Sequence, residues 1–186
     1  EYIQGSATCN DNYAWIAAVN MNANYYIAKE TRIMYNFSPQ TYLDCSGNFK
    51  NAGCNGGLAL NCFQYSAMWG VGTTNDYPYF GVQRPCRVVA GYFKNKRAVE
   101  VPANKNDELR KLLASKRYVV SVGVDLSSQE AKFYSRGVFN GACASEPTTH
   151  ALLVGYGTDI ESKNNYWLLM STFGTMWGED GIMRII

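Results

Sequence analysis

The chain has 186 residues, 47% hydrophobic and 17% charged, which suits one domain, or two small lobes that share a core. The low charged fraction excludes a disordered tail protein, and the net charge of +2 excludes a strongly basic nucleic-acid-binding surface. No apolar run approaches the roughly 18 residues that a membrane-spanning helix needs.

The first half of the chain is predicted to be helical. Residues 12–30 contain no proline or glycine, and apolar side chains recur there at helical spacing. Asn10, Asp11 and Asn12 are all good N-cap residues, so this helix is expected to begin among them. Ser38-Pro39 is typical of the start of a second, short helix. The predicted helices cover residues 12–30, 39–45, 58–69 and 106–116, with a loop at 47–57 and an irregular segment at 70–98.

The second half of the chain is predicted to form strands. These segments are rich in β-branched or apolar residues and are separated by polar turns. They cover residues 119–126, 151–156, 166–170 and 181–186. Because helices and strands are segregated along the chain, the sequence predicts an α+β fold with two lobes. The expected lobes are residues 1–93, which are helical, and residues 94–186, which are β-rich, with the crossing at 90–105.

Cysteine and histidine usage argues against a metal site. The chain has six cysteines, none in a C-x-x-C pair, and a single histidine, His150. We therefore expect neither a metal nor another cofactor. Six well-spread cysteines favour disulfides in an oxidising compartment. Six cysteines allow 15 full pairings, so their spacing alone does not choose among them.

Six segments, in the same order, resemble motifs of the papain-like cysteine peptidases, closest to the cathepsin L type. They are TCNDNYAWIAAV, FSPQTYLDCS, GCNGGLALNCFQY, DYPYFGVQRPCR, HALLVGYG and YWLLMSTFGTMWGEDGIMRI. The resemblance implies a helical lobe and a β-barrel-like lobe with a cleft between them. It also implies a secreted or a lysosome- or vacuole-like location, and further residues beyond both ends of the chain.

The family's chemistry needs a thiolate at a helix N-terminus, an imidazole beside it and a third side chain that orients the imidazole. In this resemblance Asn12 stands at the nucleophile position and His150 at the histidine position. Ser171 replaces the orienting asparagine. The residue that would stabilise the oxyanion is either Gln4 or Ser6, depending on the length of the loop that precedes the helix.

An amide is not a usable nucleophile and does not ionise near neutral pH. We therefore expect that the chain is not an enzyme and acts as a pseudoprotease. Such a protein would bind a peptide or protein partner, or belong to a larger assembly. One alternative is an unorthodox hydrolase in which His150 activates water or a nearby serine such as Ser6. A second alternative is a structural protein with a blocked cleft. Asn12 would then serve only as a helix cap.

The resemblance also implies which residues line the cleft. The expected cleft residues are Gly56, Gly57, Leu58, Ala59, Gly123, Thr149, Phe173 and Trp177, with Phe173 in place of the tryptophan that shields the catalytic pair. Glycines at 56 and 57 would let the backbone of an extended peptide approach closely.

The resemblance supplies a disulfide pairing as well. It implies the bonds Cys9–Cys54 and Cys45–Cys86. Cys62 lies on the buried stripe of a predicted helix, so a free core thiol is expected there. Cys143 is expected to pair with a cysteine beyond Ile186, or to stay unpaired if that segment is absent.

Overall fold

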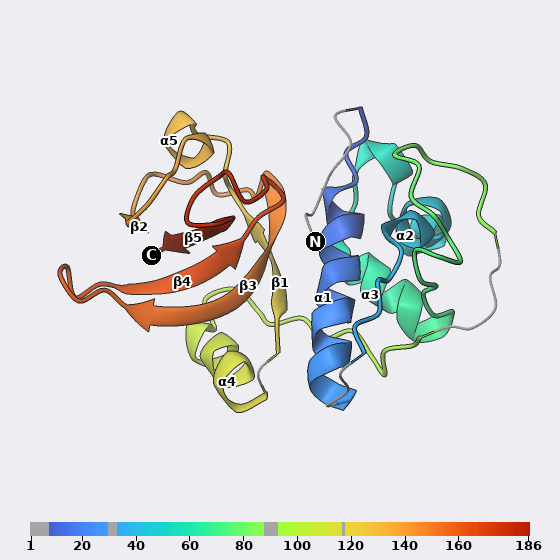
Figure 1. Ribbon diagram of the computed structural model, residues 1–186, viewed down its shortest axis with the longest axis horizontal. Coiled ribbons are helices and arrows are strands. Elements are labelled where there is room, and N and C mark those ends of the chain that lie inside the picture. The colour runs from blue at the N-terminus through green and yellow to red at the C-terminus, as the bar shows by residue number, and fades with distance from the viewer. Residues whose placement is uncertain (1–7, 30–32, 88–92, 117) are drawn as a thin grey trace. The chain divides into compact units, whose positions relative to one another are not determined.

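The chain divides into two compact units. The computed structural model describes residues 8–29, 33–87, 93–116 and 118–186. A helical unit ends at Ala103, and a β-rich unit runs from Asn104 to Ile186 (Figure 1). The predicted α+β class is confirmed. The chain stays attached to the helical unit just beyond residue 93, because Phe93 pairs with Val71 and the side chain of Asn95 bonds to Ser66.

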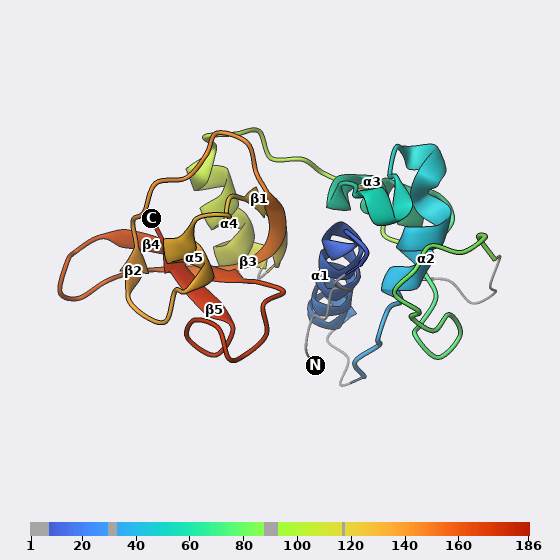
Figure 2. The same cartoon turned by 90° about the horizontal axis from the view of Figure 1, so that it is seen from above.

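The first helix, α1 (Asn12–Lys29), is buried on more sides than the predicted stripe requires. Of the apolar residues that recur there at helical spacing, Ala14, Ala18 and Met21 are buried, whereas the last, Ala28, is exposed. Tyr13, Ile16 and Ala17 are buried as well. Figure 2, which looks along α1, shows α2 and α3 on one side of it. The core of this unit lies among these three helices.

The start of α2 (Pro39–Cys45) follows the predicted signal. Ser38 is the N-cap, and its hydroxyl accepts a hydrogen bond from the backbone N–H of Thr41 at 3.2 Å. Where the sequence predicted a loop, two short 3-10 helices precede the next helix. These elements are η1 (Ser46–Phe49), η2 (Gly53–Asn55) and α3 (Ala59–Met68).

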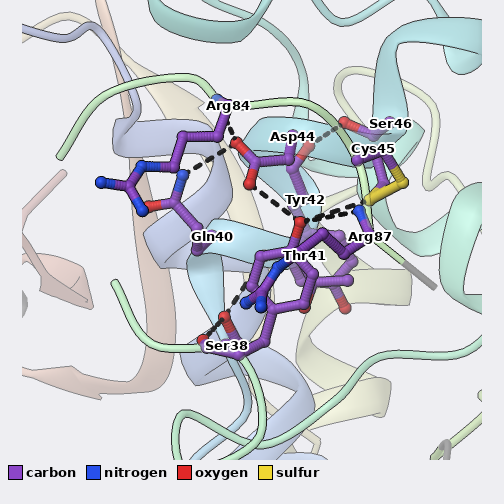
Figure 3. Close-up of a disulfide and its surroundings, with 11 residues drawn as sticks. Ser38, Gln40, Thr41, Tyr42, Asp44, Cys45, Ser46, Arg84 and Arg87 are labelled. Carbon is purple, nitrogen blue, oxygen red and sulfur yellow. Dashed lines mark hydrogen bonds between the residues drawn. A yellow bond between two sulfur atoms is a disulfide. The ribbon is translucent and has the colours of Figure 1, made fainter. Parts of the chain in front are cut away.

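A disulfide and a buried carboxylate attach the segment after α3 to α2 (Figure 3). Cys45 is bonded to Cys86. Next to it, Asp44 accepts hydrogen bonds from the Tyr77 hydroxyl at 2.9 Å and from the Arg84 backbone N–H at 2.7 Å. Burial raises the pKa of Tyr77, so its hydroxyl stays protonated and donates. The second disulfide joins Cys9 to Cys54. These are the two pairs that the resemblance implies.

The β-rich unit is built on a five-stranded sheet in the order β1-β3-β4-β5-β2. The neighbours are antiparallel, except for the parallel pair of β2 and β5. Its main elements are α4 (Asn106–Lys116), β1 (Val120–Val124), β3 (Thr149–Thr158), β4 (Asn165–Met170) and β5 (Ile182–Ile185). They lie where the sequence predicted a helix and four strands. Leu113 of α4 packs against Ala151 and Leu169 of the sheet.

Two short elements of this unit were not predicted: α5 (Gln129–Lys132) and β2 (Val138–Phe139). Elements of two to four residues give no periodic pattern. A cap signal was nevertheless available for α5, because the Ser128 hydroxyl accepts a hydrogen bond from the Ala131 N–H at 3.1 Å.

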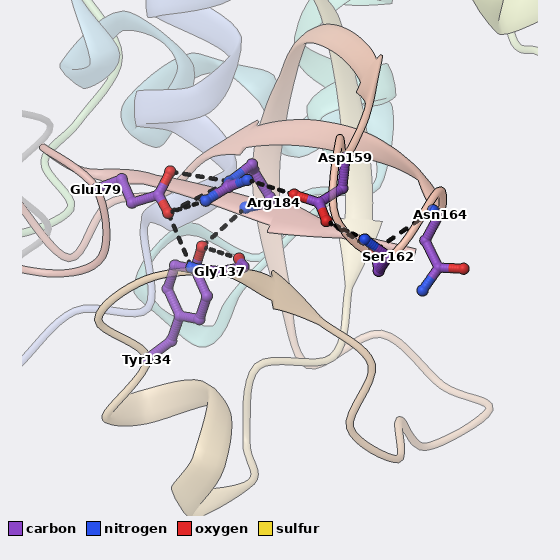
Figure 4. A network of polar contacts seen from close by, with 7 residues as sticks. All are labelled: Tyr134, Gly137, Asp159, Ser162, Asn164, Glu179 and Arg184. Atoms are coloured by element: carbon purple, nitrogen blue, oxygen red, sulfur yellow. Dashed lines mark hydrogen bonds and ion pairs between the residues drawn. The ribbon is translucent and has the colours of Figure 1, made fainter.

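An arginine on β5 fastens the loops at one end of the sheet (Figure 4). Arg184 forms ion pairs with Glu179 at 2.7 Å and with Asp159, in the turn between β3 and β4, at 3.3 Å. Glu179 also accepts a hydrogen bond from the Gly137 N–H at 2.8 Å. The segment between β4 and β5 is thereby held to two other parts of the unit.

Candidate functional site

Asn12 is the first residue of α1, and it is half-buried. The carbonyl of Asp11 accepts hydrogen bonds from the N–H groups of Ala14 at 2.9 Å and Trp15 at 3.2 Å. The N-cap position is therefore Asp11, one residue before the position that the helix-cap interpretation of Asn12 assigned. The Tyr79 hydroxyl donates to the Asp11 carboxylate, which is buried at the positive end of the helix.

The segment around η2 is fixed against the start of α1. Besides the Cys9–Cys54 disulfide, the backbone N–H of Asn10 donates to the Cys54 carbonyl at 3.0 Å. The Tyr13 hydroxyl donates to the Gly53 carbonyl at 3.2 Å, and burial raises the pKa of Tyr13 so that it remains a donor. The residues that follow η2 therefore lie beside the start of α1, where Asn12 is located.

Gly57 differs from its neighbours in its hydrogen bonding. The Gly56 carbonyl accepts from Ala52 N–H at 2.8 Å, and the Leu58 N–H donates to the Asn51 side chain at 2.8 Å. Across the described part of the chain, no hydrogen bond uses the backbone N–H or C=O of Gly57. This half-buried residue therefore offers one donor and one acceptor between two fixed neighbours.

The predicted cleft residues of the helical unit differ in exposure. Gly56 and Gly57 are half-buried, and Leu58 is 54% exposed. Ala59 is only 3% exposed and belongs to the core of the unit. The small apolar side chain of Ala59, the first residue of α3, is therefore part of the helical core.

His150 lies near the start of β3, opposite Gly123 of β1. Thr149 is opposite Val124 in the same pair of strands. Burial lowers the pKa of His150, since a charged imidazolium is less well solvated there. The imidazole is therefore neutral at neutral pH.

A carboxylate that sequence reasoning missed holds the loop before His150. Asp125, at the end of β1, accepts hydrogen bonds from the Thr148 hydroxyl at 2.9 Å and the Ala144 N–H at 2.8 Å. It also accepts from the Ser127 N–H at 3.0 Å. These hydrogen bonds lower the pKa of Asp125. The Asp-x-Ser turn was the signal available in the sequence.

Ser171 directly follows β4, whose last residue, Met170, pairs with Leu152 of β3. Because Ser171 comes directly after this pair, its backbone lies close to His150 of the neighbouring strand. Its side chain is 5% exposed, and its hydroxyl has no hydrogen-bond partner in the described part of the structure. A residue that orients the imidazole would have to donate a hydrogen bond to it or accept one from it. The hydroxyl of Ser171 does neither among the described residues, so this geometry shows no such role for it.

Phe173 and Trp177 pack edge to face, with ring centroids 5.1 Å apart. Phe173 is 44% exposed, whereas Trp177 is 8% exposed and donates from its indole Nε1 to the Ala131 carbonyl at 3.0 Å. Trp177 belongs to the core with Tyr134 and Met183. The ring of Trp177 is therefore packed inside the β-rich unit.

The structure groups the remaining candidates by unit. Asn12 and the segment Gly56–Leu58 lie together in the helical unit, and His150 lies with Gly123 and Thr149 in the β-rich unit. Gln4 and Ser6 lie outside the described residues.

Cys62 is buried and Cys143 exposed, and neither forms a disulfide among the described residues. Nowhere in that part of the chain do three or more His, Cys, Asp or Glu side chains gather as they would around a metal ion. None of the described helices is long and apolar enough to cross a membrane.

Comparison with known proteins decides the family. Residues 2–186 match the model of the papain family cysteine proteases. This chain belongs to that family. It is 31% identical over 188 residues to cathepsin L of Sarcophaga peregrina and 33% identical over 193 residues to the cathepsin L-like proteinase of Fasciola hepatica. Both alignments cover 98% of the chain, but only 54% and 56% of the relatives. The chain thus spans about half the length of the curated relatives that it matches.

Solved structures of family members share the fold. The proform of the ragweed pollen allergen Amb a 11, a cysteine protease, has a TM-score of 0.87 at 30% identity, covering all of this chain and 55% of its own. The Carica candamarcensis cysteine protease CMS1MS2, in complex with E-64, has a TM-score of 0.85 at 29% identity, covering all of this chain and 83% of its own. The papain-like two-lobe fold predicted from the motifs is confirmed.

The prediction that the chain is not an enzyme is contradicted by these comparisons. That prediction depended on the residues at a few catalytic positions, chiefly Asn12, with Ser171 and Phe173 also changed, whereas the match to a cysteine protease family extends over residues 2–186. The named relatives are proteases. Substituted positions identify chemical differences from the family motif, but they do not establish that catalysis is lost.

Proposed function

We propose that this papain-family chain binds polypeptides in an extended conformation, with the backbone of Gly57 as the central contact. An extended peptide presents N–H and C=O groups that can add to an exposed backbone edge. The unengaged N–H and C=O of Gly57 are the observation that supports this proposal. Their neighbours are already fixed, so little conformational entropy is lost on binding. The absence of a side chain lets the peptide backbone approach.

The proposal is tested by the affinity for a fluorescein-labelled pool of N-acetylated, unstructured ten-residue peptides, measured by fluorescence anisotropy. In Gly57→Ala the new Cβ would lie 2.4 Å from Asn51 Oδ1 and 3.0 Å from the Tyr13 ring, so the segment must shift. Gly47→Ala is the matched control, because nothing lies within 4 Å of a Cβ there.

We expect Gly57→Ala to weaken binding by about tenfold, the equivalent of one lost backbone hydrogen bond. Gly47→Ala should bind like the unaltered chain. Absence of binding by the unaltered chain, or equal binding by Gly57→Ala, would overturn the proposal.

A second candidate function is peptide hydrolysis with His150 of the β-rich unit as the general base. The lowered pKa of His150 supports it, because a general base must be neutral at the working pH. The Asn12 amide is not nucleophilic, so water would attack the peptide carbonyl. Turnover of a fluorogenic peptide library should fall at least about 100-fold in His150→Gln and persist in Asn12→Ala. Turnover unchanged in His150→Gln would contradict this candidate.

The two disulfides support an oxidising location, such as the secretory route or a lysosome- or vacuole-like organelle. Thiols in the cytosol are kept reduced, so such bonds do not persist there. Trapping the thiols of the native protein with an alkylating agent before lysis should leave Cys9, Cys45, Cys54 and Cys86 unmodified.

A further inference from the structure

Asn51 lies between η1 and η2 and is 7% exposed. Its side-chain nitrogen donates to the Ser46 hydroxyl at 2.8 Å and to the Cys62 sulfur at 3.3 Å. Its side-chain oxygen accepts from the Leu58 N–H at 2.8 Å and from the Asn61 side chain at 3.1 Å. An amide has two N–H donors and two lone pairs on oxygen, so the capacity of Asn51 is fully used.

This amide also touches the residue that the proposed function depends on. Asn51 Oδ1 lies where a side chain at Gly57 would begin, 2.4 Å from an ideal Cβ. Asn51 thus fixes the Leu58 N–H and packs against Gly57 at the same time. The Gly56 carbonyl is held separately by the Ala52 N–H. The peptide unit of Gly57 is therefore positioned from both sides, and Asn51 supplies one of them.

The chemistry of the partners requires an amide rather than a carboxylate. The Ser46 hydroxyl already donates to the Tyr42 carbonyl at 2.5 Å, so it needs a donor from Asn51. Cys62 is fully buried, and its pKa is raised by burial, so it stays a neutral thiol. A carboxylate at position 51 would donate to neither partner: it would face the Ser46 oxygen, whose proton is already used, and would keep only the weak S–H donor of Cys62.

We propose that Asn51 is the positioning residue of the peptide-binding segment Gly56–Leu58, and this inference rests on the function proposed above. Asn51 does not touch the peptide. It holds the segment so that the N–H and C=O of Gly57 point in fixed directions when the peptide arrives. Sequence reasoning missed Asn51 because an asparagine in a Gly- and Asn-rich stretch is typical of a turn.

The test compares Asn51→Asp and Asn51→Ala with a matched control, Ser66→Ala. Ser66 is buried in the same unit and bonds to the Cys62 carbonyl and to Asn95, and none of its hydrogen bonds reaches the segment Gly56–Leu58. Thermal midpoints show the general cost of losing a buried polar group. Affinity for the labelled peptide pool and hydrogen exchange of the Leu58 amide report on the segment itself.

We expect Asn51→Asp and Asn51→Ala to bind the pool about tenfold more weakly, while Ser66→Ala stays within twofold of the unaltered chain. In Asn51→Ala the Leu58 amide should exchange about tenfold faster than in Ser66→Ala. If the folded Asn51 variants bind as tightly as Ser66→Ala, or if Leu58 exchange is the same in all variants, Asn51 is not the positioning residue. If the unaltered chain binds no peptide, the proposed function fails, and Leu58 exchange still decides whether Asn51 orders the segment.

Discussion

At the scale of single residues, the start of α1 combines features of the family motif with one chemical difference. The helix begins at Asn12, three residues after the disulfide-bonded Cys9 and directly after the buried carboxylate of Asp11. A helix N-terminus carries partial positive charge and stabilises an anion. The backbone is therefore arranged as a thiolate would need, although the side chain present is an amide. The backbone geometry at the N-terminus of α1 therefore does not depend on whether residue 12 carries an amide or a thiol.

This separation of geometry from chemistry predicts the behaviour of Asn12→Cys. A thiol at the first residue of an 18-residue helix should have a pKa below the ordinary value of about 8.5. The pH dependence of alkylation by iodoacetamide measures it, in a Cys143→Ser background that removes the exposed free thiol. The buried Cys62 is the internal reference and should react at least about tenfold more slowly. An alkylation midpoint at or above 8.5 would contradict this account of the helix start.

At the scale of elements, the helical unit depends on covalent attachment of its long irregular segment. Cys86 is bonded to α2, and Asp44 accepts two hydrogen bonds from the same segment (Figure 3). The disulfide closes a loop with a sequence separation of 41 residues. Cross-linking a loop of that length restricts the unfolded chain and so stabilises the folded one.

Removing this disulfide, in Cys45→Ser with Cys86→Ser, should therefore lower the free energy of unfolding by about 3–4 kcal/mol. Urea denaturation with tryptophan fluorescence measures it, and Cys143→Ser is the control because that thiol is exposed and unpaired. A loss below about 1 kcal/mol would mean that the hydrogen bonds of Asp44 alone hold the segment.

The elements also show what the sequence could predict. The Ser38-Pro39 cap and the apolar strands were predictable because their signals are local. The burial of Ala59 and Trp177 could not be predicted, since it depends on which neighbours cover a side chain. Asn51 and Asp125 were missed for a related reason. Their partners are brought together only by folding, as with the Thr148 hydroxyl, which is 23 residues away from Asp125.

At the scale of the whole molecule, ionisation near neutral pH is dominated by one group. The chain has a single histidine. The acidic groups with resolved shifts, among them Asp125 and Glu179, have pKa values below their ordinary range. They bear on stability only in more acidic solution, because the stabilisation they provide is lost as pH falls through those low values. His150 is therefore the group that links stability to pH in the mildly acidic range.

The sign of this pH dependence follows from the lowered pKa of His150. Below the ordinary value of 6.5 the unfolded chain binds a proton that the folded chain does not, so stability falls as pH decreases from 6.5 toward the folded pKa. Urea midpoints from pH 7.5 to pH 5, followed by the fluorescence of Trp167 and Trp177 in the β-rich unit, should show this decline. His150→Gln should remove it. A decline of the same size in His150→Gln would assign it to other groups.

The proposed peptide binding uses the backbone of Gly57. The most direct measurement is amide hydrogen exchange, followed by NMR on the isotope-labelled chain with and without saturating peptide pool. We expect the chemical shift of the Gly57 amide to change and its hydrogen exchange to slow by at least about tenfold. The chemical shift and exchange rate of the Leu58 amide, which is already bonded to Asn51, should change little. Saturation of the chain with peptide while the Gly57 amide keeps its shift and its exchange rate would contradict the claim.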